Sequence, residues 1–198
     1  QTIVGNIKKF AAGGKTAVVS TINGDSNVPF YKELGNQGLK ATDVPVVAFS
    51  VGEEELRGID TKPLVGHLAA WNYFMSVKSA ENTAFMKLYK DWAKANKVPN
   101  ADKVVTNDPM EATYIGFNMW AKAVQAAKTT DPTAVQKAII GVEAPNLSGG
   151  ISKMLPNHHI TKPVLIGEIQ EDGQFATVWE TEGLVPGDAW SDFLPESK

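Results

Sequence analysis

The chain has 198 residues, and its 43% hydrophobic content, with 9% aromatic residues, is enough for a buried core. Its 19 basic and 22 acidic residues are interspersed and give a net charge of −3, which argues against nucleic acid as a partner. The absence of cysteine excludes disulfides and thiolate chemistry, and no apolar run approaches the roughly 20 residues that span a bilayer.

The first predicted element is a helix over residues 1–14. Ile3, Ile7 and Phe10 fall on one helical stripe, and the pair Gly13-Gly14 then stops the helix. Because the sequence begins inside this element and has no initiator Met, we expect it to be a C-terminal segment of a longer protein.

Residues 15–74 alternate between strand and helix patterns. The runs "KTAVVSTI", "VPVVAFSV" and "VGHLAAWNYF" predict three strands, over 15–22, 44–51 and 65–74. A helix with Asp25 or Ser26 as its N-cap follows the first strand, and a short helix over 52–59 follows the second. This order predicts a parallel α/β unit with right-handed crossovers.

Helical patterns dominate residues 79–141, where no strand is predicted. We expect helices over 81–96, 108–127 and 132–140. The second begins "DPME", which suggests a capping box with Asp108 as N-cap, Pro109 at the first helical position and Glu111 at the third. Two apolar runs over 162–169 and 174–181, separated by "QEDG", then predict a terminal β-hairpin.

Polar turns follow all three predicted parallel strands. The carboxyl ends of such strands meet at one edge of the sheet, and small molecules bind outside that edge. The turns offer carboxylates, an amide, hydroxyls, close-approach glycines and aromatic rings. The candidate ligand-binding residues are Asn23, Gly24, Asp25, Ser26, Ser50, Val51, Glu54, Trp71, Tyr73 and, from the later helix start, Asp108.

Simpler roles remain open for several of these residues. Asp25 could be only a helix cap, acids at 53–55 are ordinary in a first helical turn, and Trp71 and Tyr73 could be core residues. The "NHH" at 157–159 fits a tight polar turn better than a metal site, since no third ligand has suitable spacing. Recognised catalytic motifs are absent, so binding without chemistry and without a cofactor fits best.

Five stretches together resemble the urea and short-chain-amide binding proteins of ABC importers, a group that includes branched-chain amino acid receptors. The stretches are "VVSTINGDSNVPFYKEL", "VPVVAFSVGEEELRGI", "GHLAAWNYFMSV", "VTNDPMEATY" and "IGEIQEDGQFATVWE". The resemblance implies part of a type I periplasmic binding fold, in which two α/β lobes close over a ligand. It places residues 1–74 in the second lobe, 75–159 in the first lobe as a helical portion, and 160–198 back in the second lobe.

The resemblance implies a periplasmic or cell-surface receptor that binds urea, a short-chain amide or a small amino acid and delivers it to a membrane permease. Two alternatives stay open: a cytoplasmic amide or amino acid sensor of the same fold, and an amidohydrolase. A leader peptide or lipobox before Gln1 would favour the receptor, and ammonia release would favour the hydrolase. We also expect the isolated chain to bind ligand weakly and to self-associate through apolar helix faces at 85–92 and 114–124.

Overall fold

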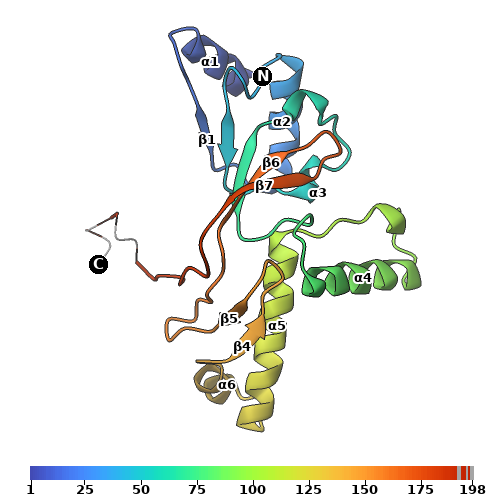
Figure 1. The fold of residues 1–198 in the computed structure, drawn as a ribbon, viewed down its shortest axis with the longest axis vertical. Helices are drawn as coiled ribbons and strands as arrows, with labels where there is room; N and C mark the ends of the chain where they lie inside the picture. The colour runs from blue at the N-terminus through green and yellow to red at the C-terminus, as the bar shows by residue number, and fades with distance from the viewer. Residues whose placement is uncertain (191–192, 195, 197–198) are drawn as a thin grey trace.

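The computed structural model describes residues 1–190, 193, 194 and 196, and it shows two bodies that meet near the middle of the long axis (Figure 1). One body, which we call the sheet body, contains a five-stranded sheet with helices against it. The other, the helix body, contains three helices and a two-stranded sheet. The chain leaves the sheet body after residue 71 and returns to it before residue 165. The assignment of these bodies to the lobes of a larger receptor stays a prediction.

The five-stranded sheet joins three parallel strands to a terminal hairpin. β1 (Val18–Ser20), β2 (Val46–Ala48) and β3 (Leu68–Trp71) are parallel neighbours. β6 (Leu165–Ile169) and β7 (Phe175–Glu180) extend the sheet antiparallel beside β3. The sequence predicted both the three parallel strands and the terminal hairpin, and the structure confirms them. The third strand is shorter than its apolar run, because the chain leaves the ladder after Trp71 and enters the connection to the helix body.

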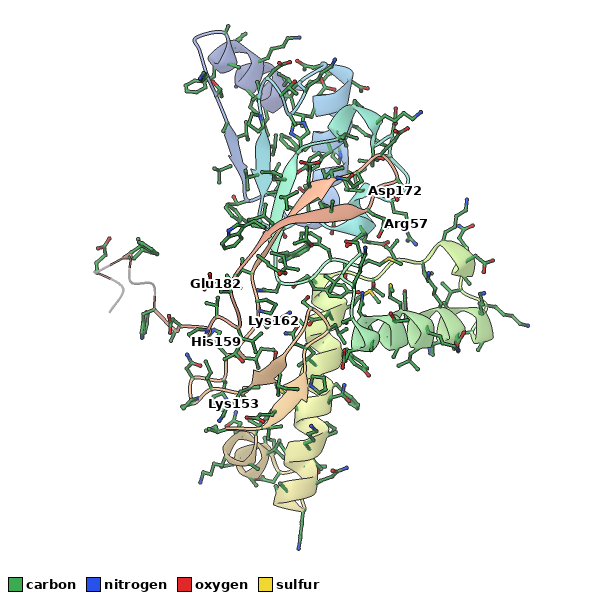
Figure 2. All side chains as sticks on the ribbon, in the orientation of Figure 1. Arg57, Lys153, His159, Lys162, Asp172 and Glu182 are labelled. Atoms are coloured by element: carbon green, nitrogen blue, oxygen red, sulfur yellow. The ribbon has the colours of Figure 1, made fainter. Side chains whose placement is uncertain are left out.

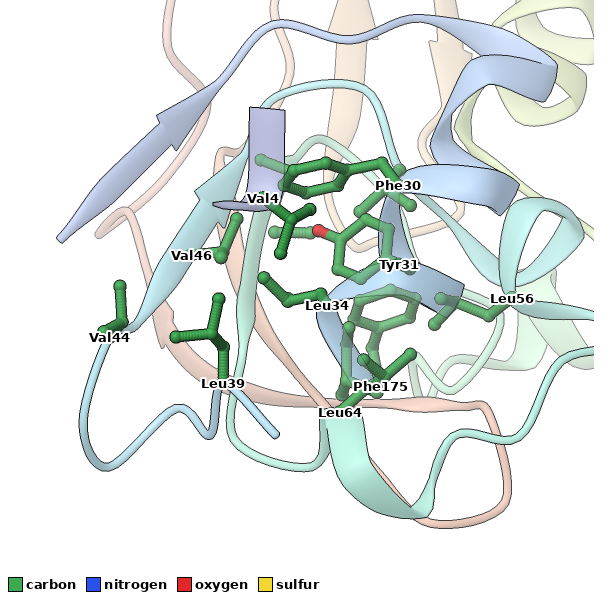
Figure 3. Close-up of a cluster of buried hydrophobic side chains, with 14 of the residues drawn as sticks. Val4, Phe30, Tyr31, Leu34, Leu39, Val44, Val46, Leu56, Leu64 and Phe175 are labelled. Atoms are coloured by element: carbon green, nitrogen blue, oxygen red, sulfur yellow. The ribbon is translucent and has the colours of Figure 1, made fainter. Parts of the chain in front are cut away.

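Three helices, α1 (Thr2–Ala11), α2 (Asn27–Asn36) and α3 (Glu53–Leu56), accompany the parallel strands. Their buried side chains form the main hydrophobic core with strand residues such as Val46 and Phe175, as Figure 3 shows around Tyr31 and Leu34. The expected apolar stripe of α1 is wrong in part. Ile3 and Phe10 are 63% and 76% exposed, and Val4 is the residue of this helix that is buried.

The helix body contains α4 (Ala80–Ala95), α5 (Asp108–Ala127) and α6 (Pro132–Ala138), which confirms the three predicted helices. It also contains a hairpin that was not predicted, formed by β4 (Glu143–Pro145) and β5 (Ile151–Lys153). Residues 75–159 are therefore not a purely helical portion. Each of these strands has three residues, which is too short to show an alternating pattern in the sequence.

The apolar faces expected on α4 and α5 are exposed only in part. Phe85 is buried against Tyr73 and Leu147, and its ring lies 4.8 Å from that of Tyr114. The large side chains that do face solvent are Leu88, Trp92, Phe117 and Trp120, each between 42% and 63% exposed. Self-association through these side chains stays a prediction.

Tyr31 offers a test of the main core. Its side chain is 1% exposed, and its hydroxyl has no hydrogen-bond partner among the described residues. Because an unpaired buried hydroxyl is unfavourable, we expect Tyr31→Phe to raise the free energy of unfolding by about 1 kcal/mol. Leu34→Ala, in the same core, should lower it by about 2–5 kcal/mol by leaving a cavity. Urea denaturation measures both changes, and a destabilised Tyr31→Phe would mean that the hydroxyl is paired.

Candidate functional site

The candidate site is the edge of the sheet where the three parallel strands end. β1 runs beside β2 in register from Val18 to Ser20, and β2 runs beside β3. The turns that follow the strands, over residues 21–27, 49–54 and 72–73, therefore leave the sheet on the same side. The structure thus brings together the three turns that the sequence selected.

The first turn is the most accessible of the three. Asn23, Gly24, Asp25 and Ser26 are all exposed, and residues Gly24–Ser26 form a single 3-10 turn before α2. The N-cap of that turn is Asn23 and the N-cap of α2 is Ser26, so Asp25 caps neither. Of the two residues that the sequence left open as N-cap of α2, Ser26 occupies that position, but its side chain makes no capping hydrogen bond. This leaves the Asp25 carboxylate available to a ligand.

Asn27, which the sequence analysis did not select, fixes the first turn to the second. Its side chain is fully buried, and its amide donates hydrogen bonds to the carbonyl oxygens of Ile22, at 3.0 Å, and Ser50, at 2.8 Å. A polar residue in the first turn of a helix gives no sequence signal for such a role, because these positions are commonly polar.

The second turn offers less side-chain surface than expected. Ser50 is half-buried, whereas Val51 is fully buried in the main core. The Glu54 carboxylate is exposed but lies 2.6 Å from the Arg57 guanidinium. Gly52 lies under the Trp71 ring so closely that a Cβ there would be 2.8 Å from a ring carbon. Only a glycine therefore fits beneath Trp71.

The third turn separates two residues that were expected to share a strand. β3 ends at the half-buried Trp71, so Tyr73 lies beyond it, and the predicted strand over residues 65–74, which included both, is too long. Tyr73 is completely buried, and its hydroxyl lies 2.6 Å from Asn82 Oδ1 and 2.7 Å from Thr106 Oγ1. It therefore belongs to the packing of the helix body.

Asp108 is not the helix cap that the sequence suggested. The N-cap of α5 is Asn107, whose side chain accepts from the Met110 N–H at 3.2 Å, so Pro109 is at the second helical position. Asp108 instead accepts a 3.0 Å hydrogen bond from the Asn72 backbone N–H. The predicted capping box is wrong, because Glu111 is fully buried and bonded to Lys162.

A buried charge cluster lies beside the site, where the two bodies meet. Figure 2 shows Lys162 next to the upper end of α5. Its ammonium donates to Glu111 and lies 3.7 Å from Asp108. Burial raises the pKa of both carboxyl groups, and the charge of Lys162 partly offsets the increase. No local pattern could have found this cluster, since Lys162 and Glu111 are 51 residues apart in the sequence.

A third buried carboxyl group, that of Glu53, joins the sheet body to the connection between the bodies. Its side chain is 2% exposed, and Oε1 accepts from the Met75 backbone N–H. Burial raises the pKa of Glu53 from 4.5 to about 8, against the opposing effect of hydrogen bonds from its own N–H and that of Met75, and nearby Glu55 and Asp108 add to the increase.

The exposed side chains of the first turn include carboxylate, amide and hydroxyl groups, which form hydrogen bonds. Within the described residues, no group of three or more His, Cys, Asp or Glu side chains could hold a metal ion. The "NHH" stretch forms a tight turn, in which Asn157 accepts from the His159 N–H at 3.0 Å and His158 has a φ of 62°. None of the described helices is long and apolar enough to cross a bilayer.

Comparison with known protein families identifies the family of the chain. Residues 1–196 match the family model described as "Periplasmic binding protein domain". The chain belongs to this family of periplasmic binding proteins.

Solved structures support the fold. One is a solute-binding protein of an ABC transporter from Rhodopseudomonas palustris, in complex with p-hydroxybenzoic acid. It is 24% identical, with a TM-score of 0.74 over 93% of this chain and 49% of that chain. Another is a leucine-binding protein from Thermotoga maritima, 14% identical, with a TM-score of 0.67 over 90% of this chain and 47% of that chain. The type I periplasmic binding fold is confirmed.

The chain is shorter than the proteins to which it is similar. It spans about half the length of the two solute-binding proteins. A curated protein named limonene hydroxylase, from Geobacillus stearothermophilus, is 31% identical over 126 residues, which are 64% of this chain but 22% of that protein. The match therefore concerns a minor part of the larger protein.

Glu53 gives a pH-dependent test of the site's buried charge. Because its pKa is raised by folding, the stability it contributes is fully present below pH 4.5 and is lost as the pH rises through about 8. Glu53→Gln keeps an acceptor for Met75 but cannot ionise. We expect the free energy of unfolding of this variant to be higher than that of the parent by about 2 kcal/mol at alkaline pH. At acidic pH, the two free energies should be nearly equal.

Denaturant titrations across the pH range measure this difference. Glu54→Gln is the matched control, because Glu54 is exposed and its ion pair with Arg57 contributes little. A difference between parent and Glu53→Gln that does not change with pH would contradict the assignment.

Proposed function

We propose that the chain is part of an extracytoplasmic solute receptor of an ABC importer, and that the edge formed by the three turns is one face of its ligand site. The observation that carries the proposal is the exposure of Asn23, Asp25 and Ser26 in the first turn, beside the ends of β1 and β2. Asp25 is not at the N-cap of either adjacent helix, so helix capping does not explain its presence there. The family and the transporter binding proteins of similar fold support it.

The ligand we propose is a small polar molecule with N–H donors, such as urea, a short-chain amide or an amino acid. An ionised Asp25 only accepts hydrogen bonds, so it suits these donors better than it suits a second carboxylate. The benzoate-type ligands of similar proteins are the main competing class, since p-hydroxybenzoic acid is bound to one of them. A half-buried Trp71 and an exposed Phe49 near the edge would suit an aromatic ring.

The proposed partner is the membrane permease of the importer, and the proposed location is the periplasm or the cell surface. Because the chain spans about half of its relatives, the other face of the site would come from the rest of the receptor. We therefore expect the chain alone to bind ligand at about millimolar Kd where the complete receptor binds at about micromolar Kd.

A thermal-shift screen of the complete receptor tests the function. The ligands are urea, acetamide, leucine and p-hydroxybenzoate. A rise in melting temperature with one of the first three supports the proposed ligand class, because a ligand that binds the native state stabilises it. A response to p-hydroxybenzoate alone would replace that class with aromatic acids. Ammonia release from urea or acetamide would instead favour an amidohydrolase.

Asp25 gives the sharpest single-residue test. Asp25→Ala in the complete receptor should weaken binding of the ligand found in the screen by about 1.5–3 kcal/mol, the usual contribution of a hydrogen bond to a charged group. Asp43→Ala is the matched control, because Asp43 is an exposed aspartate that precedes β2 and so lies toward the opposite edge of the sheet. Isothermal calorimetry measures both. Equal affinities for Asp25→Ala and the parent would remove Asp25 from the site.

A further inference from the structure

The first turn contains the one Asn-Gly pair of the sequence, Asn23-Gly24. Both residues are exposed, and the Asn23 side chain makes no capping hydrogen bond although it stands at the N-cap of the 3-10 turn. The Gly24 N–H has no hydrogen-bond partner among the described residues. A side-chain amide and the backbone N–H that follows it are therefore both unpaired at the surface of the molecule.

The space around the Gly24 nitrogen is open. Its φ is 57°, which glycine adopts without strain, and a Cβ built on Gly24 would have no neighbour within 4 Å. Because residue 24 has no side chain, nothing on it shields its nitrogen from the amide carbon of Asn23. The ψ angle of Asn23 is 147°, so a rotation about this bond must bring the nitrogen toward that carbon. The rotation breaks no hydrogen bond of either group.

We propose that Asn23 is a site of spontaneous deamidation, which replaces its side-chain amide by a carboxylate. The Gly24 nitrogen attacks Cγ of Asn23 and forms a C–N bond, while the bond from Cγ to the side-chain nitrogen breaks. That nitrogen leaves as ammonia and takes the proton that the Gly24 nitrogen loses. Water then adds its hydroxyl to one of the two carbonyl carbons of the cyclic imide. The bond from this carbon to the Gly24 nitrogen breaks, and the nitrogen takes the remaining proton of the water.

The product is aspartate or isoaspartate, depending on which carbonyl carbon the water attacks. Either product carries a new carboxylate two residues before Asp25, and residue 23 loses its side-chain N–H donors. Because like charges repel, the modified turn would bind ligand carboxylates less well than the unmodified turn. This consequence rests on the proposed function, whereas the reaction itself depends only on the structure of the turn.

Asn157 is an exposed asparagine with the opposite arrangement. Its Oδ1 accepts from the His159 N–H at 3.0 Å, and its Nδ2 donates to the Gly187 carbonyl at 2.7 Å. The backbone N–H that follows it, that of His158, donates to the Leu155 carbonyl at 2.9 Å. All the groups that would have to react at Asn157 are therefore held by hydrogen bonds, and exposure alone does not distinguish Asn23.

Peptide mapping of the folded chain tests the proposal without any ligand. The chain is incubated at mildly alkaline pH, where the Gly24 nitrogen loses its proton more readily, and is digested with trypsin after increasing times. The peptide over residues 16–32 contains Asn23 and also Asn27, which is fully buried and serves as an internal control. Mass spectrometric fragmentation assigns the mass increase to one of the two. An unincubated sample corrects for deamidation during digestion.

The variant His158→Gly supplies the matched control. The φ of His158 is 62°, so glycine fits there without strain, and the variant has a second Asn-Gly pair whose reacting groups are held by the three hydrogen bonds of the Asn157 turn. We expect Asn157 of the folded variant to react about tenfold more slowly than Asn23, because these bonds must open first. In concentrated urea, which unfolds the chain, the two should react at similar rates.

In the folded parent chain, we expect Asn23 to react within about threefold of its rate in urea, since exposed segments without hydrogen bonds open at little cost. Conversion of Asn23, with Asn27 unchanged, supports the proposal. An Asn23 that stays unmodified in the folded chain while it is converted in urea would overturn it. Both readouts are independent of the ligand, so failure of the proposed function would leave this result unaffected.

Discussion

The arrangement of the two bodies depends on how one buried ammonium is neutralised. Lys162 is 9% exposed and must remain near the carboxylates of Glu111 and Asp108, because an unpaired charge there would be strongly unfavourable. This requirement brings the connection that returns to the sheet body to the first turn of α5. Asp108 in turn accepts from Asn72, so the connection that leaves the sheet body is held at the same place. Both connections are consequently held against the first turn of α5.

The sheet edge gains its accessibility from the parallel order of β1, β2 and β3. Parallel pairing sends the three following turns to one side, and the buried amide of Asn27 holds the first two turns together. The exposed polar groups of the first turn are therefore presented by a rigid support. Such preorganisation favours binding, because the groups need not be ordered when a ligand arrives. The main core beneath, around Leu34 and Phe175, provides that rigidity.

The sequence predicted well those features that depend on neighbouring residues. Runs such as "KTAVVSTI" identified the parallel strands, and "QEDG" identified the terminal hairpin, since both signals are local. Prediction failed where a residue's role depends on a distant partner. Asp108 and Glu111 match a capping box locally, but Asn107 caps the helix, and both carboxylates interact with Lys162, more than 50 residues later. Val51 and Tyr73 were selected because they lie at the ends of predicted strands, and the structure shows that both are completely buried.

In the proposed receptor, the turns after the parallel strands form one face of a ligand site that is completed by a second lobe. A crystal structure of the complete receptor with its ligand tests this most directly. We expect the ligand to lie between the two lobes, with polar atoms within hydrogen-bond distance of Asp25 and of neighbouring groups in residues 23–26. A ligand bound away from this edge, with the first turn open to solvent, would show that the three turns do not form the ligand site.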